Sequence, residues 1–304
     1  DLQHGMVEAL FTIDEETGLT GARELDPTLL KSNTLLNLDS EEEGALYVGC
    51  SGGRDTAATW KLETDAAPAG TVGIEVKVGG VREKKLDDWE KLLESAYRGE
   101  AEGPIFVALR ETVRRFGIPR QLLLDLLSAF RQDVVQTRYD SWDELLDYCR
   151  RSANPVGRLV LLVFEQEDEA LPAFSDALCT ALQLANHWQD AAVDYRRGRI
   201  YVPQQLLQRH GVTDWDFSTG RVSEGWRGLM GELIGRTREL FERGKPICDR
   251  VGRELRFEMR LTWLGGMSIL DRIEATGGDV FRQRPQHGPL DKAALAWRAW
   301  RWPA

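Results

Sequence analysis

Long hydrophobic runs, closely spaced cysteines and clustered histidines are all missing from this 304-residue sequence. No apolar stretch reaches about eighteen residues, so we expect no transmembrane helix. The net charge of −10 argues against nucleic acid as a partner. The four cysteines form no C-x-x-C pair and the four histidines show no metal-ligand spacing, which predicts reduced thiols in a cytoplasmic protein without a histidine-based zinc centre. No initiator Met or signal peptide opens the chain, as expected for a piece of a longer protein.

Charge is distributed unevenly along the chain. Residues 1–83 contain 16 acidic and 6 basic residues and so carry the whole net charge, whereas 33 acidic and 33 basic residues balance over 84–304. The first segment also contains short β-type runs separated by glycine-rich turns, such as residues 72–78 followed by two glycines. We therefore predict two regions with a boundary near residue 83.

Apolar residues recur every three or four positions over most of the second region, as amphipathic helices require. Prolines mostly fall where helices are expected to start, but Pro155 lies inside a helical pattern and predicts a kink. The fold class is therefore mainly α. The predicted helices cover residues 85–98, 104–116, 119–132, 141–164, 172–196, 222–250, 253–275 and 290–301.

The helix predicted over residues 172–196 carries a line of polar residues. A turn of about 100° per residue brings positions three and four apart onto one face, and that face holds Gln183, Asn186, Asp190 and Asp194. The two carboxylates repel each other, and only Arg197, downstream of Asp194, partly offsets them. Carboxylate and amide oxygens suit Mg²⁺, which takes further ligands from water and phosphate. A solvated polar face is the alternative interpretation.

Basic residues follow this line within two helical turns. Arg196, Arg197 and Arg199 come first, and Tyr201 and Pro203 follow them. Acidic residues that can hold Mg²⁺, followed by arginines that can bind phosphate oxygens, supply the chemistry that a diphosphate leaving group needs.

The sequence NHWQDAAVD at residues 186–194, continued by GRIYVP at residues 198–203, resembles the second aspartate-rich motif of the squalene/phytoene synthase family. Residues 130–139 and 147–157 resemble the same family in the same order. These motif sequences most resemble those of the bacterial hydroxysqualene synthases of hopanoid biosynthesis, and the resemblance covers residues 84–304.

This resemblance implies an all-α isoprenoid-synthase fold with the diphosphate in a central cavity. It also implies Mg²⁺-dependent ionisation of presqualene diphosphate, or head-to-head condensation of farnesyl diphosphate, with water capture to hydroxysqualene. No dinucleotide fingerprint is present, and this outcome needs no nicotinamide. The implied residues are Asn186, Asp190 and Asp194 for Mg²⁺, Gln183, Arg199 and Tyr201 for the substrate, and Tyr148 and Asp133 for catalysis. Core packing is the alternative for Tyr148, and we expect packing roles for Tyr139 and Trp142.

The family also carries a first D-x-x-x-D motif on an early helix, and residues 84–304 have no counterpart of it. Asp39 and Glu43 have the spacing, but their surroundings predict a strand end and a loop. We therefore expect the synthase-like fold to be incomplete at its N-terminal side and its activity to be impaired.

Residues 1–80 instead resemble an internal fragment of an aminoacyl-histidine dipeptidase, a zinc peptidase with two metals. The resemblance implies that Glu15 is a general base and that Glu16 and Asp39 are metal ligands. The His and Asp ligands of a complete site are missing, so we predict no peptidase activity. The chain would then be a chimera or fusion, in which an α/β metallopeptidase-like fragment precedes the helical domain. Three segments carry the resemblance, residues 11–22, 37–41 and 49–53.

Three hypotheses for the function follow. The first is a synthase acting on a prenyl diphosphate with partner enzymes of hopanoid synthesis. The second is a zinc dipeptidase fragment with a helical passenger, and the third is a non-catalytic scaffold that binds prenyl diphosphate. Mg²⁺-dependent binding separates the first hypothesis from the second, and turnover separates it from the third.

The aromatic and basic segment Trp297–Trp302 predicts peripheral contact with the inner membrane, because tryptophan and arginine suit a bilayer interface. A packed final helix is the alternative interpretation.

Overall fold

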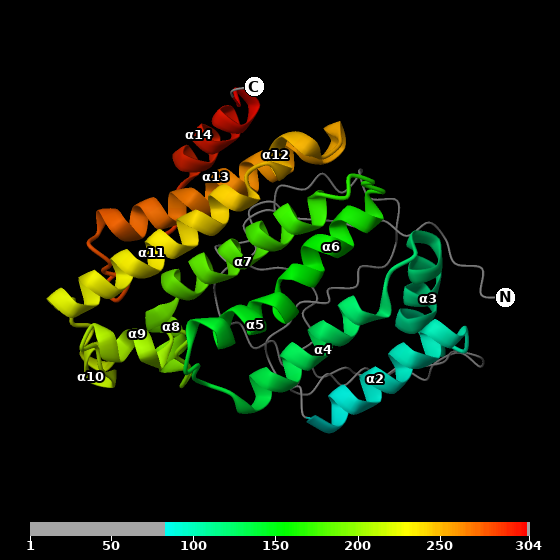
Figure 1. The fold of residues 1–304 in the computed structure, drawn as a ribbon, viewed down its shortest axis with the longest axis horizontal. Helices are drawn as coiled ribbons and strands as arrows, with labels where there is room; N and C mark the ends of the chain where they lie inside the picture. Colours follow the sequence, from blue (N-terminus) through cyan, green and yellow to red (C-terminus); the bar gives the residue numbers. More distant parts are fainter. Residues whose placement is uncertain (1–82, 303–304) are drawn as a thin grey trace, which may run out of the picture. The chain divides into compact units, whose positions relative to one another are not determined.

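Thirteen α-helices make up the part of the chain that the computed structural model describes, residues 83–302 (Figure 1). The prediction of a mainly α fold is confirmed for these residues, whose only β-type pairing is an isolated parallel bridge between Arg138 and Ile200. The α/β segment expected upstream, with Glu15, Glu16 and Asp39, lies outside the described residues. The helices are α2 (Glu83–Arg98), α3 (Pro104–Phe116), α4 (Arg120–Val135), α5 (Trp142–Ser152), α6 (Asn154–Val163), α7 (Leu171–Gln189), α8 (Ala191–Arg196), α9 (Gln204–Arg209), α10 (Asp214–Thr219), α11 (Glu224–Gly244), α12 (Ile247–Arg250), α13 (Arg253–Ala275) and α14 (Pro289–Trp300).

Three of the predicted long helices are each divided in two. The pattern over 141–164 becomes α5 and α6, because Pro155 lies in the first turn of α6, where its missing N–H breaks no helical hydrogen bond. The pattern over 222–250 becomes α11 and α12, with Pro246 at the start of the second helix. The short helices α9 and α10 were not predicted. Apolar periodicity identifies long helices well, but a six-residue helix offers less than two turns of it.

Helix α7 runs between α6 and α11 and contacts both along its length (Figure 1). Gly157 allows the close approach of α6, because a Cβ there would lie 2.2 Å from Ser175 Oγ and 2.5 Å from Cys179 Sγ. On the other side, the buried indole of Trp188 donates a hydrogen bond to Thr237 Oγ1 of α11 at 2.8 Å. Side chains on both faces of α7 therefore belong to the main hydrophobic core.

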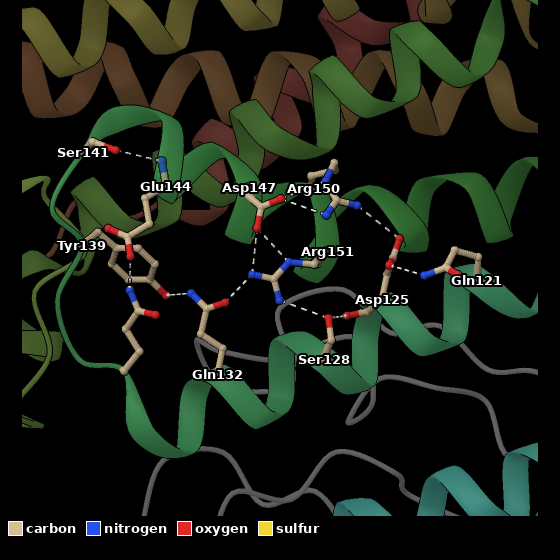
Figure 2. A network of polar contacts seen from close by, with 11 residues as sticks. Gln121, Asp125, Ser128, Gln132, Tyr139, Ser141, Glu144, Asp147, Arg150 and Arg151 are labelled. Carbon is tan, nitrogen blue, oxygen red and sulfur yellow. Dashed lines mark hydrogen bonds and ion pairs between the residues drawn. The ribbon is translucent and has the colours of Figure 1, made fainter.

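A second, smaller hydrophobic cluster joins α2, α3 and α4, built mainly from Leu86, Leu93, Ala96, Phe106 and Leu127. Helix α4 then connects this cluster to α5 through polar contacts. Figure 2 shows these contacts, which we call the α4–α5 network and which comprise Asp125, Ser128, Gln132, Asp147, Arg150 and Arg151.

No helix among the described residues is long and apolar enough to cross a membrane. Among the described residues, Cys149, Cys179 and Cys248 carry free thiols.

Candidate active site

The line of acidic residues spans a break between α7 and α8, so the single helix predicted over 172–196 is corrected to two. Asp190 adopts φ −99° and ψ 8° and separates them. The backbone hydrogen bonds nevertheless continue, from Asp190 N to Asn186 O and from Asp194 N to Asp190 O, both 2.8 Å. The break is thus local, and the three residues remain one helical turn apart.

The two carboxylates have different surroundings. Asp190 accepts hydrogen bonds from Arg284, with 2.5 Å between Nε and Oδ1 and 3.1 Å between Nη2 and Oδ2. Burial, together with the nearby charge of Asp190, raises the pKa of Asp194 to about 6. Arg197, Arg199 and Arg284 lower the pKa of Asp194 against these effects, so the charged form of Asp194 is disfavoured mainly by its burial.

Arg284 lies in the segment between α13 and α14, and a second contact fixes that segment to the same place. The buried side chain of Gln189 donates to the carbonyl oxygen of Pro285 at 2.5 Å. Adjacent residues at the end of α7 thus hold adjacent residues of this segment. Neither contact was predicted from the sequence, because both join positions about 95 residues apart and no local pattern signals them.

An extended stretch after α8 presents two further predicted residues. Gly198, at φ 79°, makes the turn that leads into it. Side chains alternate in extended backbone, so Ile200 and Val202 are buried in the core while Arg199 and Tyr201 share the opposite side. Ile200 N donates to Thr137 O at 2.9 Å, which aligns this stretch with the loop after α4.

That alignment brings Arg199 to Asp133 at the end of α4. Arg199 Nη1 lies 3.3 Å from Asp133 Oδ1, and Nη2 donates to the Asp133 carbonyl oxygen at 2.6 Å. The Tyr148 hydroxyl donates to Asp133 Oδ2 at 3.1 Å. Burial outweighs these contacts and raises the pKa of Asp133, and burial also raises the pKa of Tyr148. Three predicted residues from separate segments therefore form one cluster.

Aromatic rings lie beside this cluster. The rings of His187 and Tyr201 stack with centroids 3.7 Å apart and planes 12° apart. Tyr139 and Tyr148 lie 5.7 Å and 6.0 Å from Tyr201. Burial lowers the pKa of His187 to about 3, so its ring is neutral at physiological pH. We call Tyr139, Tyr148, His187 and Tyr201 the aromatic group.

His187 is a second residue that sequence reasoning missed, since its spacing gave no ligand pattern and stacking leaves no trace in sequence. Gln183, predicted to bind substrate, lies with its Nε2 atom 3.4 Å from His187 Nε2. Tyr139 is buried and Trp142 stacks on Trp188 at 6.3 Å, which agrees with the packing roles expected for them.

The acidic pair and the Asp133 cluster are neighbours. Arg199 N donates to Asp194 O at 2.8 Å, and the charge of Arg199 lowers the pKa of Asp194 against the larger effect of burial. Asp194 in turn contributes to the raised pKa of Tyr201, which is due first to burial. The side chain of Asn186 makes no hydrogen bond within the part of the chain that the structure describes.

The donor atoms at the end of α7 fit Mg²⁺. Asp190 and Asp194 supply hard oxygen ligands one helical turn apart, and Asn186 supplies an amide oxygen one turn before them. Burial disfavours the charged form of Asp194, and a bound cation would offset that cost as any nearby opposite charge does. Over residues 83–302, no group of three or more His, Cys, Asp or Glu side chains could hold a metal ion, so water and phosphate would complete the shell.

An open hollow of about 550 Å³ lies elsewhere, at the C-terminal ends of α3 and α6. Its lining includes Arg115, Phe116, Leu162 and Glu165 and none of the predicted site residues. Its charged lining residues, Arg115, Glu165 and Glu167, are separate from the carboxylates, arginines and rings described above. The chemistry of the side chains therefore locates the candidate site better than the size of this hollow does.

These helices gather paired carboxylates, arginines and aromatic rings beside one another, as the resemblance to isoprenoid synthases implies. The sequence profile of the squalene/phytoene synthase family matches residues 59–291 of this chain. The chain therefore belongs to the squalene/phytoene synthase family. The match begins before residue 83, near which the charge distribution predicts a boundary.

Individual relatives agree with this assignment. The hydroxysqualene synthase of Zymomonas mobilis is 41% identical over 216 residues, which cover 68% of this chain and 70% of that protein. Phytoene synthase 3 of Zea mays is 36% identical over 217 residues, which cover 69% of this chain and 51% of that protein. The chain thus spans about half the length of the maize relative.

Solved structures give the same fold. The crystal structure of a squalene synthase from Alicyclobacillus acidocaldarius is 40% identical and superimposes with a TM-score of 0.63, over 66% of this chain and 76% of that one. A dehydrosqualene synthase, at 19% identity and a TM-score of 0.67, supports the fold alone. The chain is therefore squalene/hydroxysqualene synthase-like, and these comparisons give the peptidase resemblance no support.

Proposed function

We propose that the chain catalyses the Mg²⁺-dependent ionisation of presqualene diphosphate, with water capture to hydroxysqualene in hopanoid biosynthesis. The observation that carries this proposal is the half-buried pair Asp190 and Asp194, which lie one helical turn apart beside the charges of Arg199 and Arg284. Similarity to a hydroxysqualene synthase, at 41% identity, favours this substrate over two molecules of farnesyl diphosphate.

Asp190, Asp194 and Asn186 would hold the metal. Bound Mg²⁺ supplies positive charge that stabilises the departing diphosphate. Arg199 is positioned by Asp133, so its guanidinium and the hydroxyl of Tyr201 can bind diphosphate oxygens from a fixed geometry.

Within the aromatic group, Tyr148, His187 and Tyr201 suit the carbocation that remains, whereas Tyr139 packs in the core. Ring faces attract cations, and apolar walls limit access of water. Because burial keeps His187 neutral, its ring adds no repelling positive charge to that environment. In the capture step, the oxygen of one water molecule bonds to the cationic carbon. Asp133, whose pKa is raised by burial, can accept the proton that this water releases, and Tyr148 keeps its carboxylate oriented.

Turnover provides the direct test. The full chain is incubated with presqualene diphosphate and Mg²⁺, and the products are identified by gas chromatography and mass spectrometry, with and without a chelator. We expect hydroxysqualene only with Mg²⁺. Zn²⁺-dependent cleavage of a dipeptide ending in His would favour the peptidase hypothesis instead, and binding without turnover would identify a scaffold.

A substitution tests the metal ligands separately. We expect Asp190→Ala to weaken Mg²⁺-dependent diphosphate binding by about ten-fold or more. Asp271→Ala, which removes an exposed carboxylate of α13 that pairs with Arg238 of α11, is the matched control and should bind normally. If Asp190→Ala leaves diphosphate binding unchanged at saturating Mg²⁺, the metal assignment is wrong.

A further inference from the structure

Helix α14 has apolar residues on both of its faces. Its inner face packs into the core through Leu295 and Ala299, which are buried. Its outer face carries large apolar side chains that are open to solvent: Leu290 is 87% exposed, Trp297 60% and Trp300 72%. A helix on the surface of a protein ordinarily turns a polar face to water.

The outer face contains no acidic residue. At about 100° per residue, one arc of the helix contains all of its exposed apolar side chains with an arginine near the centre and another toward one edge. This arc, which we call the outer face of α14, consists of Leu290, Ala293, Ala294, Trp297, Arg298, Trp300 and Arg301.

The charges of the outer face are not neutralised by the protein. Asp291 is turned away, since it pairs with Arg272 at 2.5 Å and accepts from Gly288 N at 2.7 Å. Among the described residues, neither Arg298 nor Arg301 pairs with a carboxylate. The guanidinium of Arg301 lies instead over the ring of Trp297, 5.5 Å from its centroid.

The far end of α14 is held rigidly against the core. The ring of Trp302 packs edge-on against Trp263, with centroids 5.5 Å apart, and Lys245 lies 5.9 Å from the centroid of Trp302. The outer face is therefore presented on a fixed platform, and binding to it would order few additional side chains.

We propose that the outer face of α14 docks the protein onto the surface of an anionic lipid bilayer. Indole rings favour the interface between headgroups and acyl chains, and unpaired arginines are attracted to anionic headgroups. A symmetric contact with a second copy would bring arginines of the same sign together with no acidic residue to receive them. This inference rests on exposure and charge, and it holds whatever reaction the chain catalyses.

Vesicle flotation tests the proposal with the full chain. We expect binding to phosphatidylcholine vesicles that contain phosphatidylglycerol, and about ten-fold weaker binding to vesicles without it. The double variant Trp297→Ala/Trp300→Ala should lose about ten-fold in affinity, and Arg298→Gln/Arg301→Gln should lose the preference for anionic lipid.

Trp215→Ala is the matched control. Trp215 is 55% exposed and has Arg221 over its ring at 5.1 Å, so it offers the same residue types in another helix. It should bind like the unchanged chain, and thermal melting should show that every variant is folded. Failure to bind anionic vesicles, or equal binding by all variants, would overturn the proposal. So would self-association in analytical ultracentrifugation that the tryptophan variant abolishes while vesicle binding persists.

Discussion

The α4–α5 network and the acidic pair at the α7–α8 junction contain the same residue types but differ in electrostatic balance. In the network, Asp147 lies between Arg150 and Arg151, at 2.8 Å and 2.9 Å (Figure 2). Burial alone would raise the pKa of Asp147, but hydrogen bonds from both arginines lower it. For Asp194, burial and a neighbouring carboxylate raise the pKa to about 6.

This contrast distinguishes a carboxylate that stabilises the fold from one that is suited to bind a ligand. A carboxylate whose pKa is lowered in the folded state stabilises the fold when it is ionised, and one whose pKa is raised destabilises it. The fold tolerates the second situation where a ligand can relieve it, because a cation bound there recovers the lost free energy. In the α4–α5 network the two arginines already stabilise the ionised Asp147, so a bound cation would recover no free energy there.

The largest effect that we expect is a pH dependence of stability caused by His187, the other group of the site whose charged form is disfavoured by burial. Its folded pKa of about 3 lies below the unfolded value of 6.5, so the unfolded chain binds more protons between those values. Stability is therefore complete above 6.5 and falls as pH decreases towards 3. From about pH 7 to about pH 5, this one group should lower the free energy of unfolding by about 2 kcal/mol.

Urea unfolding of the unchanged chain and of His187→Phe over that pH range measures this effect. Relative to His187→Phe, the unchanged chain should lose about 2 kcal/mol of unfolding free energy between about pH 7 and about pH 5, because phenylalanine keeps the stacked ring and removes the titration. Contributions from all other groups cancel in this difference. Parallel curves for the two proteins would mean that His187 is not held neutral.

Two substitutions that each remove a carboxylate charge should change the free energy of unfolding in opposite directions. The Asp194→Asn variant should raise the free energy of unfolding by about 1–2 kcal/mol near pH 8 without Mg²⁺, because it removes a disfavoured charge; the range allows for partial exposure of the carboxylate. The Asp147→Asn variant should lower it by about 0.5–1 kcal/mol, because two arginines lose their acceptor. Paired urea melts measure both. If both variants change the free energy of unfolding in the same direction, the proposed difference between the two regions is wrong.

The gain from Asp194→Asn has a defined pH range. Asp194 keeps its proton below its folded pKa of about 6, and the uncharged side chain then resembles asparagine. The stabilisation should therefore shrink as pH falls through 6 and vanish near the ordinary value of 3.8. A gain that persisted in acid would point to improved packing by the amide.

Much of this fold was predictable from local patterns. Apolar periodicity located helices such as α13 to within a residue, whereas the kink predicted at Pro155 was wrong, since that residue lies in the first turn of a separate helix, α6. The spacing of Asp190 and Asp194 predicted their common face, because the hydrogen bonds of a helix fix positions four apart even across a small distortion.

The rest depends on contacts between distant positions. The pairing of Arg199 with Asp133 requires the loop after α4 to lie along the stretch after α8, and no local pattern encodes that alignment. Stacking of His187 on Tyr201 likewise follows from the packing of α7. The sequence resemblance named three of these residues by role, Asp133, Arg199 and Tyr201, but it could not describe the contacts that hold them.

Arg284 offers the finest test of the comparison. In the α4–α5 network the arginines form ion pairs with Asp147 and no ligand competes for that carboxylate. Arg284 instead pairs with Asp190, a carboxylate that Mg²⁺ would need as a ligand. Both side chains of this pair are largely buried, at 21% and 14% exposure, so the ion pair is screened only weakly by water. Mg²⁺ must therefore compete with the guanidinium for Asp190.

We expect Arg284→Gln to tighten Mg²⁺ binding about three- to ten-fold, which corresponds to about 1 kcal/mol. Calorimetric titration with Mg²⁺ alone, without substrate, measures the change. Arg282→Gln is the matched control, because Arg282 is exposed and pairs only within its own loop, 3.4 Å from Asp279. Weaker Mg²⁺ binding by Arg284→Gln would show that the guanidinium organises Asp190 for the metal, as an arginine of the α4–α5 network organises its partners, and the distinction between the two regions would fail at this residue.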